Sequence, residues 1–277
     1  MTTSHAIPDP LAVSRPRTVH GPCEDAKSRA DRGSARLSVG PDGRLRHRIR
    51  PDEISNDLAG WIADDLVAPG LIEPGAFERT FVSVIASVDP GWTAFYRNTL
   101  DELAAGGTPG GTVAGMAPVH DRAAELAVGS VAELGCCFGF LSLRLAADGH
   151  AVTAVDLSTG TVALLGRVAP GLGLTLDAVA GDATAVPLAD GSADTVFAVH
   201  LLEHLPVGVD RPVLAEMLRV ARRRVVVAVP YEDEPDQAWG HVRTFDAEAL
   251  RELGESTGRG FEVSDHHGGW LVIDTDR

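Results

Sequence analysis

The chain has 277 residues, of which 44% are hydrophobic and 23% are charged, and it carries a net charge of −15, as expected of a globular soluble protein. The first 50 residues hold ten basic and five acidic side chains, so the remainder carries a net charge of −20. An acidic main body argues against a nucleic-acid partner, which would need a basic surface.

Residues 1–50 are rich in Pro, Ser, Arg and Gly and have no apolar periodicity, which predicts a basic disordered tail. The tail could touch an anionic partner, although a solvated tail is the simpler interpretation. No apolar run approaches the roughly 20 residues of a membrane span, and residues 1–17 lack the apolar core of a secretory signal. We therefore expect a cytoplasmic protein without a membrane partner.

Apolar residues at helical spacing predict three helices between residues 52 and 103. Their apolar positions are Leu58, Trp61, Ile62 and Leu66, then Phe77, Phe81, Val84, Ile85 and Val88, and finally Trp92, Phe95, Tyr96, Leu100 and Leu103. Residues 104–112 hold four glycines and one proline, which predict a hinge. We expect residues 51–112 to form a helical lid and hinge ahead of a domain at residues 113–277.

Strands and helices alternate after the hinge. Strands are expected at 131–134, 151–157, 174–182, 193–200, 223–230, 261–265 and 269–275, and helices at 140–149, 159–168, 210–221 and 246–257. Asp210 and Asp246 are the expected N-caps of the last two helices, and Gly149 the expected stop of the first. The pattern predicts an α/β fold with a doubly wound, mostly parallel sheet whose last two strands pair antiparallel.

The loop after the first of these strands holds two glycines and two cysteines. A dinucleotide loop of the form G-x-G-x-x-G would need glycine where this chain has Cys137 and Phe140, which argues against NAD or FAD. The three cysteines are Cys23, Cys136 and Cys137, an odd number with two adjacent, so no disulfide framework is predicted. Adjacent cysteines without a second pair also argue against metal ligation.

Glu133, Gly135 and Gly139 fit another pattern, acidic-x-Gly-x-x-x-Gly. Here residues 113–277 resemble the class I S-adenosylmethionine-dependent methyltransferases, whose first motif is acidic-x-Gly-x-Gly-x-Gly, with Cys137 at the middle position. S-adenosylmethionine carries no pyrophosphate, so small residues suffice in this loop. The resemblance implies a Rossmann-like, seven-stranded sheet with an antiparallel last strand, and S-adenosylmethionine as the cofactor.

The resemblance also implies cofactor-binding residues further along the chain. Asp156 ends the second strand, where a carboxylate can accept hydrogen bonds from both ribose hydroxyls; Leu157 follows it. Asp182 would accept from the adenine amino group, and the amide of Ala183 would meet the ring. His200, at the end of the fourth strand, completes the cofactor set. The alternatives are that Asp156 caps the next helix and that Asp182 only shapes a turn.

A hydroxyl acceptor needs a base, and His204 and His241 are the candidate catalytic residues. A short helical turn would place His200 and His204 on one face, as a pair that can bind a metal with Glu203 pointing elsewhere. Similar Glu-His pairs are common at this position of the family, and a structural role is the alternative. We expect no metal site.

Substrate-binding candidates are Tyr231, Arg243 and Tyr96. The Tyr231 ring could stack on a sugar, and Tyr96 lies in the predicted lid. Arg243 could dock an anionic acceptor, or it could pair with an acid of residues 232–236. Trp270 is expected to pack in the core, and His266 and His267 to belong to a turn.

These residues predict O-methylation of a small-molecule or sugar hydroxyl. The layout also resembles the mycofactocin oligosaccharide methyltransferases in its Arg-rich start, in residues 95–103 and in the Cys-Phe-Gly-Phe loop at 137–140. That resemblance implies a glucose hydroxyl of an oligosaccharide as the acceptor. The alternatives are N-methylation of another small metabolite, a methyltransferase-like binding protein without activity, and a nicotinamide oxidoreductase. The sequence does not define an oligomeric state.

Overall fold

The structure, a computed structural model, describes residues 19–20 and 35–275. The chain divides into two compact units, Met1–Ala117 and Pro118–Arg277. Most of the predicted tail lies outside the described residues. Among the residues that are described, no helix has the length and apolar character needed to cross a membrane.

The N-terminal unit contains a small sheet that the sequence analysis did not expect. Strand β2 (Leu37–Val39) pairs antiparallel with β3 (Leu45–His47), and β1 (Val19–His20) pairs parallel with β3. The expectation that residues 1–50 lack regular structure is therefore wrong for 37–47. The Asp65 carboxylate accepts hydrogen bonds from the amides of Arg36 and Leu37, at 2.9 and 3.1 Å, and so fixes the start of β2. The strands are too short to show a period of two.

The three helices predicted in this unit are confirmed. They are α1 (Leu58–Ile62), extended by a π-helical turn at Ala63–Val67, α2 (Phe77–Ser87) after a short 3-10 turn at Pro74–Ala76, and α3 (Gly91–Ala104). Phe81 on α2 meets Phe95 on α3 edge to face, with ring centroids 5.6 Å apart. This geometry is favourable for aromatic pairs, and it ties the two amphipathic helices together.

A fourth helix, α4 (Thr112–Leu126), begins at the end of the predicted hinge. The buried Asp57 carboxylate accepts a hydrogen bond from the Val113 amide at 2.8 Å, which satisfies one of the free N–H groups at the helix start. Sequence reasoning missed this helix, in which Pro118 lies inside the helical pattern.

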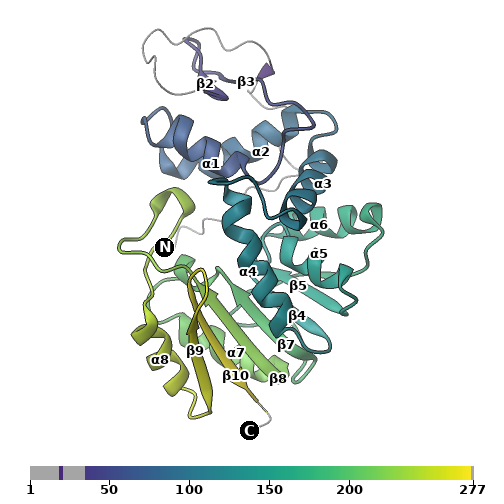
Figure 1. The fold of residues 1–277 in the computed structure, drawn as a ribbon, viewed down its shortest axis with the longest axis vertical. Helices are drawn as coiled ribbons and strands as arrows, with labels where there is room; N and C mark the ends of the chain where they lie inside the picture. Colours follow the sequence, from purple (N-terminus) through teal and green to yellow (C-terminus); the bar gives the residue numbers. More distant parts are fainter. Residues whose placement is uncertain (1–18, 21–34, 276–277) are drawn as a thin grey trace. The chain divides into compact units, whose positions relative to one another are not determined.

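The C-terminal unit is built on a seven-stranded sheet in the order β6-β5-β4-β7-β8-β10-β9, in which only β10 runs antiparallel to its neighbours (Figure 1). Its strands are β4 (Val131–Leu134), β5 (Val152–Asp156), β6 (Asp177–Ala180), β7 (Ala193–Val199), β8 (Ala221–Val229), β9 (Phe261–Asp265) and β10 (Gly269–Asp274). The predicted doubly wound, mostly parallel sheet with an antiparallel last strand is confirmed.

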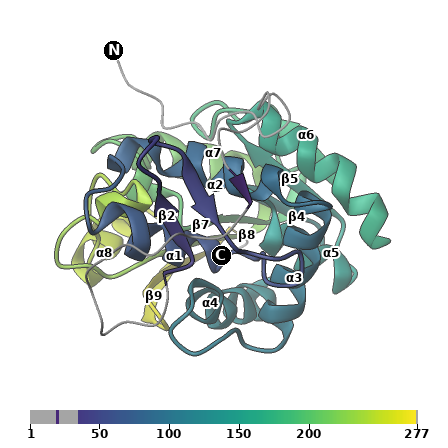
Figure 2. The same ribbon diagram turned by 90° about the horizontal axis from the view of Figure 1, so that it is seen from above.

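Helices cover both faces of this sheet. They are α5 (Phe140–Ala147), α6 (Thr159–Val168), α7 (Asp210–Val220) and α8 (Ala247–Glu255), with 3-10 turns at Ala169–Leu172, Leu202–His204 (η4) and Gln237–Trp239 (η5). Val225 and Val227 of β8 pack with α7 and α8, whereas Val226 packs on the other face with α4 and α5. Because both faces are buried, the strand is a continuous apolar run. Helix α6 packs on β5 and β6, and α8 packs on β9 at the opposite end of the sheet; Figures 1 and 2 show α6 on the β5 side and α8 on the β9 side.

The helix ends confirm two of three predicted signals. Gly149, with φ of 93°, follows the end of α5, and the Asp246 carboxylate caps α8 by accepting from the Ala249 amide at 2.8 Å. The prediction that Asp210 is the N-cap of α7 is wrong. The helix begins at Asp210 itself, whose carboxylate instead lies 3.3 Å from Nη1 of Arg243.

Candidate active site

The loop between β4 and α5 needs glycine at two positions. Gly135 and Gly139 have φ values of 73° and 77°, in the left-handed region that favours glycine. A Cβ at Gly135 would lie 2.7 Å from Leu201, and one at Gly139 would lie 2.5 Å from Leu165. The loop therefore turns tightly at the carboxyl edge of the sheet, with no room for side chains at these two positions.

Cys137 and Asp156 meet at this loop. The Cys137 amide donates to Oδ2 of Asp156 at 2.8 Å, and Oδ1 of Asp156 accepts from the Ser158 amide at 2.8 Å. Cys137 is exposed and has a left-handed φ of 51°. Ser158, not Asp156, is the N-cap of α6, because its hydroxyl accepts from the Thr161 amide. Each Asp156 oxygen can accept a further hydrogen bond.

Glu133 lies beneath the loop and is buried, with its carboxylate accepting a hydrogen bond from the Ser142 hydroxyl. Burial raises the pKa of Glu133 to about 7, because a carboxylate loses its hydration there. The side chain ties β4 to α5 and holds the loop between them. It has no exposed face toward a ligand.

Asp182 and Leu157 stand at the ends of neighbouring strands. Oδ1 of Asp182 accepts from the amide and the hydroxyl of Thr184, at 2.8 and 2.7 Å, so Asp182 does shape a turn. Its carboxylate is nevertheless exposed, as is the Leu157 side chain at 58%. Ala183, which follows Asp182 in the chain, is half-buried. An exposed apolar side chain at the same sheet edge as the half-buried Asp156 and the exposed Asp182 suits a ligand that combines a flat ring with hydroxyls.

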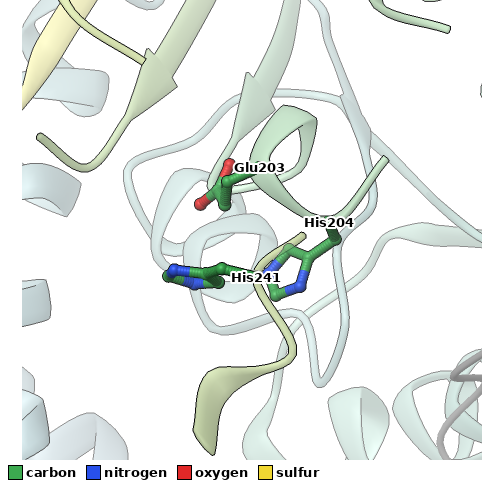
Figure 3. A group of neighbouring side chains, drawn as sticks. All are labelled: Glu203, His204 and His241. Atoms are coloured by element: carbon green, nitrogen blue, oxygen red, sulfur yellow. The ribbon is translucent and has the colours of Figure 1, made fainter. Parts of the chain in front are cut away.

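Glu203, His204 and His241 come together from two segments, η4 and the loop after η5 (Figure 3). The Val242 amide donates to the Glu203 carbonyl at 2.9 Å and holds the segments together. The imidazoles of His204 and His241 lie edge to face, with centroids 4.9 Å apart. One donor atom from each of the three side chains lies within 4.8 Å of the others.

The predicted pairing of His200 with His204 is therefore wrong, as is the prediction that Glu203 points elsewhere. Residues 202–204 form a 3-10 turn in which i and i+4 do not share a face. Glu203 joins His204 and His241, whereas His200 is exposed and its Nδ1 lies 3.2 Å from Oε1 of Glu203. The His200 amide donates to the Ala228 carbonyl, with a left-handed φ of 52°.

The three side chains of this cluster differ in their hydrogen-bond partners. Glu203 is 1% exposed, and neither of its carboxylate oxygens accepts a hydrogen bond from the part of the chain that is described. Nδ1 of His241 lies 2.8 Å from Oε2 of Glu232, and Nδ1 of His204 lies 3.3 Å from the Gly240 carbonyl. Loss of hydration lowers the pKa of His204, although its side chain keeps an exposed edge, and the nearby Glu203 opposes this.

The predicted substrate residues have different surroundings. Arg243 pairs with Asp210 and stacks over the Phe245 ring at 4.3 Å, so the alternative that it pairs with an acid of residues 232–236 is wrong. Tyr231 is 36% exposed and lines a hollow of about 310 Å³ with Glu232, Asp233, Phe245, Asp246 and Ala247. Tyr96 is fully buried in contact with Phe95.

Trp270 packs in the core as predicted. It is 1% exposed, and its indole N–H donates to the His266 carbonyl at 2.8 Å. His266 and His267 lie in the turn before β10, with rings 5.0 Å apart. The two histidines thus belong to a turn, as predicted.

Sequence reasoning missed His120, because this residue lies on helix α4, which the sequence analysis did not predict. The side chain is 7% exposed, and its Nδ1 has no hydrogen-bond partner among the described residues. Burial lowers the pKa of His120 to about 4, and the charge of His200 adds to this shift, so the imidazole is neutral near pH 7. The buried Val119 and Ala123, four residues apart, were the available sign of a helix here.

The sheet order, the glycine loop after β4 and the acid at the end of β5 are the features that the resemblance to class I S-adenosylmethionine-dependent methyltransferases predicts. Residues 132–229 match the family model described as a methyltransferase domain. The C-terminal unit therefore contains an S-adenosylmethionine-dependent methyltransferase domain, with S-adenosylmethionine as its cofactor. The glycine cradle and the exposed Leu157 between two acids fit that cofactor.

Solved structures match this chain at low sequence identity. A methyltransferase from Aquifex aeolicus is 17% identical, with 56% of this chain and 86% of that chain covered and a TM-score of 0.46. The magnesium protoporphyrin IX methyltransferase of Synechocystis PCC 6803, with bound S-adenosylhomocysteine, is 16% identical, with 58% and 83% covered and a TM-score of 0.47. A Pyrococcus horikoshii protein is 17% identical, with 58% and 89% covered and a TM-score of 0.48. A search of curated protein sequences found no match.

Proposed function

We propose that the protein transfers the methyl group of S-adenosylmethionine to a hydroxyl of a small molecule or a sugar. The observation that carries the proposal is the cluster of Glu203, His204 and His241. Leu201 packs against Gly135, so the cluster begins two residues from a side chain that touches the glycine loop. A hydroxyl is a weak acid and needs groups that take up its proton, whereas a neutral amine does not.

The cofactor supplies an activated methyl group, and the chain has to bind and orient it. Gly135 and Gly139 keep the loop open, and Asp156 would accept hydrogen bonds from the ribose hydroxyls while it holds the Cys137 amide. Asp182 and the Ala183 amide would contact the adenine, and Leu157 would cover its face. Glu133 acts from below by fixing the loop, and His200 borders the site at the end of β7.

The acceptor's proton would leave through the histidine pair. A carboxylate can only accept, so the Nδ1–H of His241 donates a hydrogen bond to Glu232, which leaves Nε2 as a free acceptor. Desolvation lowers the pKa of His204, which keeps that ring neutral and able to take a proton. His204 and His241 are thus the proposed catalytic residues.

Acceptor binding would use the loop after β8 and the N-terminal helices. The exposed edge of Tyr231 suits stacking on a sugar ring. Arg243 is already paired with Asp210, so it would position this loop. Residues 51–112, which include Tyr96, are proposed as a lid. The layout resemblance supports the glucose of a mycofactocin oligosaccharide as the acceptor.

Two measurements test the proposal. Calorimetry with S-adenosylmethionine, S-adenosylhomocysteine and NAD should show binding of both sulfur ligands and no binding of NAD. Label transfer from methyl-labelled cofactor should then be compared between sugar hydroxyls and amines, with an alkali-stable methyl ether as the expected product. Labelled amines alone would establish an N-methyltransferase, and cofactor binding without transfer to extract would establish a binding protein.

A further inference from the structure

We propose that Glu203, His204 and His241 bind one divalent first-row transition-metal ion. The metal site stands on its own geometry, and its catalytic role rests on the proposed function. From the sequence alone we expected no metal site, because similar Glu-His pairs are common at this position of the family and have a structural role as the alternative. The folded chain instead brings a carboxylate and two imidazoles together from η4 and the loop after η5 (Figure 3).

The three side chains are close enough to share an ion. Ligand atoms around a tetrahedral ion with bonds of about 2.1 Å lie about 3.4 Å apart. One donor atom from each side chain already lies within 4.8 Å of the other two. Small side-chain rotations would therefore complete the shell, and the hydrogen bond from Val242 to the Glu203 carbonyl keeps the two segments in place.

The Glu203 carboxylate is the second, independent observation. It is 1% exposed, it faces both imidazoles, and neither oxygen accepts a hydrogen bond from the described residues. A buried carboxylate without such partners is costly unless a cation compensates its charge. The exposed Nδ1 of His200, 3.2 Å from Oε1, could do so only when protonated, and it defines the competing explanation.

The surroundings of the imidazoles fit metal ligation. Glu232 holds Nδ1 of His241 at 2.8 Å, and the Gly240 carbonyl lies 3.3 Å from Nδ1 of His204. Both partners are acceptors, so each Nδ1 carries its proton and each Nε2 keeps a lone pair. Carboxylate and carbonyl groups commonly orient metal-binding histidines in this way.

The donor set indicates which ions would bind. Two imidazoles and one carboxylate suit Mn²⁺, Fe²⁺, Co²⁺ or Zn²⁺, whereas Mg²⁺ and Ca²⁺ prefer oxygen ligands throughout. Three protein ligands leave at least one position for an acceptor oxygen. An ion there would lower the pKa of a bound hydroxyl. With both imidazoles bound to the ion, neither could act as the base, so in the metal-bound protein the hydroxyl proton would pass to solvent and not to the histidine pair. The oxygen–methyl bond would form as the sulfonium–methyl bond breaks, giving a methyl ether and S-adenosylhomocysteine.

The test measures metal binding separately from methyl transfer. The full chain is stripped with a chelator, dialysed against Mn²⁺ or Zn²⁺, and analysed for metal content; Co²⁺ titration followed by visible absorption reports the ligand set. We expect one ion per chain, with affinity at least tenfold lower in Glu203→Gln and in His241→Gln. The matched control is His266→Gln, which changes a histidine outside the cluster and should bind like the wild type.

The outcomes separate the alternatives. No ion on the wild-type chain, or unchanged affinity in both cluster variants, overturns the metal site. Circular dichroism and S-adenosylmethionine affinity check folding, and His204→Gln replaces any variant that fails to fold. Hydroxyl methylation at full rate in metal-free protein would remove the metal's catalytic role and keep the proposed function. Metal binding without hydroxyl methylation would keep the metal site and remove the proposed function, together with the metal's catalytic role in it.

Discussion

Asp156 shows how one side chain serves both the fold and the site. Its two oxygens accept from the Cys137 and Ser158 amides, so it ties the glycine loop to the start of α6. Each carboxylate oxygen of Asp156 keeps a further lone pair, which could accept a hydrogen bond from a ribose hydroxyl. The cofactor affinity and the shape of the loop are therefore coupled through this residue.

Asp156→Ala should lower the affinity for S-adenosylmethionine more than tenfold, because it removes the ribose acceptor and frees the loop amide. Calorimetry measures the affinity. Asp148→Ala is the comparison, since its carboxylate pairs with Arg144 at the end of α5 and has no proposed contact with the cofactor. Near-normal affinity of Asp156→Ala would remove this residue from the ribose role.

Gly139→Ala should destabilise the protein more than Gly173→Ala. Both glycines have left-handed φ values, 77° and 74°, so the two substitutions share the backbone strain of about 1 kcal/mol. Only the Cβ at position 139 would meet a neighbour, Leu165, whereas position 173 is open. Urea unfolding should resolve the difference, and equal losses would mean that Leu165 moves aside freely.

Glu133 gives a pH dependence of stability. Its pKa is raised to about 7 in the folded state from an ordinary value of 4.5, so the folded protein binds the proton more tightly than the unfolded chain. This contribution is present below pH 4.5 and is lost as the pH rises to 7, by up to about 3 kcal/mol. Glu133→Gln should flatten the unfolding free energy over that window, and an unchanged slope would contradict the assignment.

At the scale of single elements, η4 and the loop after η5 owe their positions to bonds that sequence spacing does not encode. The Val242 amide bonds to the Glu203 carbonyl, and Arg243 pairs with Asp210 at the start of α7. Residues far apart in the chain thereby become one site. The predicted i, i+4 pair failed because a 3-10 turn replaced the expected helical turn.

Helix α8 allows a test of the predicted N-cap, Asp246. Asp246→Ala should lower the free energy of unfolding by about 1 kcal/mol, because the Ala249 amide loses its acceptor. Glu248→Ala in the first turn of the same helix is the control; its carboxylate pairs only with the exposed Arg251. Equal effects in urea titrations would show that the cap contributes nothing.

At the scale of the whole molecule, the chain consists of two compact units, and the family match lies entirely in the second. We expect calorimetric unfolding in two transitions. Saturating S-adenosylmethionine, at about 100 times its Kd, should stabilise the C-terminal unit by about 2.7 kcal/mol. A shift of only one transition would argue against the proposed lid, since a lid that closes on the cofactor should be stabilised with it.

The sequence by itself determined the sheet, because buried parallel strands form apolar runs and alternate with amphipathic helices. Gly135, Gly139 and Asp156 were also identifiable, since the backbone turn and the strand end fix their places. Tertiary structure alone decided that Glu203 joins His204 and His241 and that Arg243 pairs with Asp210. Such pairings depend on how loops that follow different strands lie in the folded chain. The local spacing of residues in the sequence does not determine that arrangement.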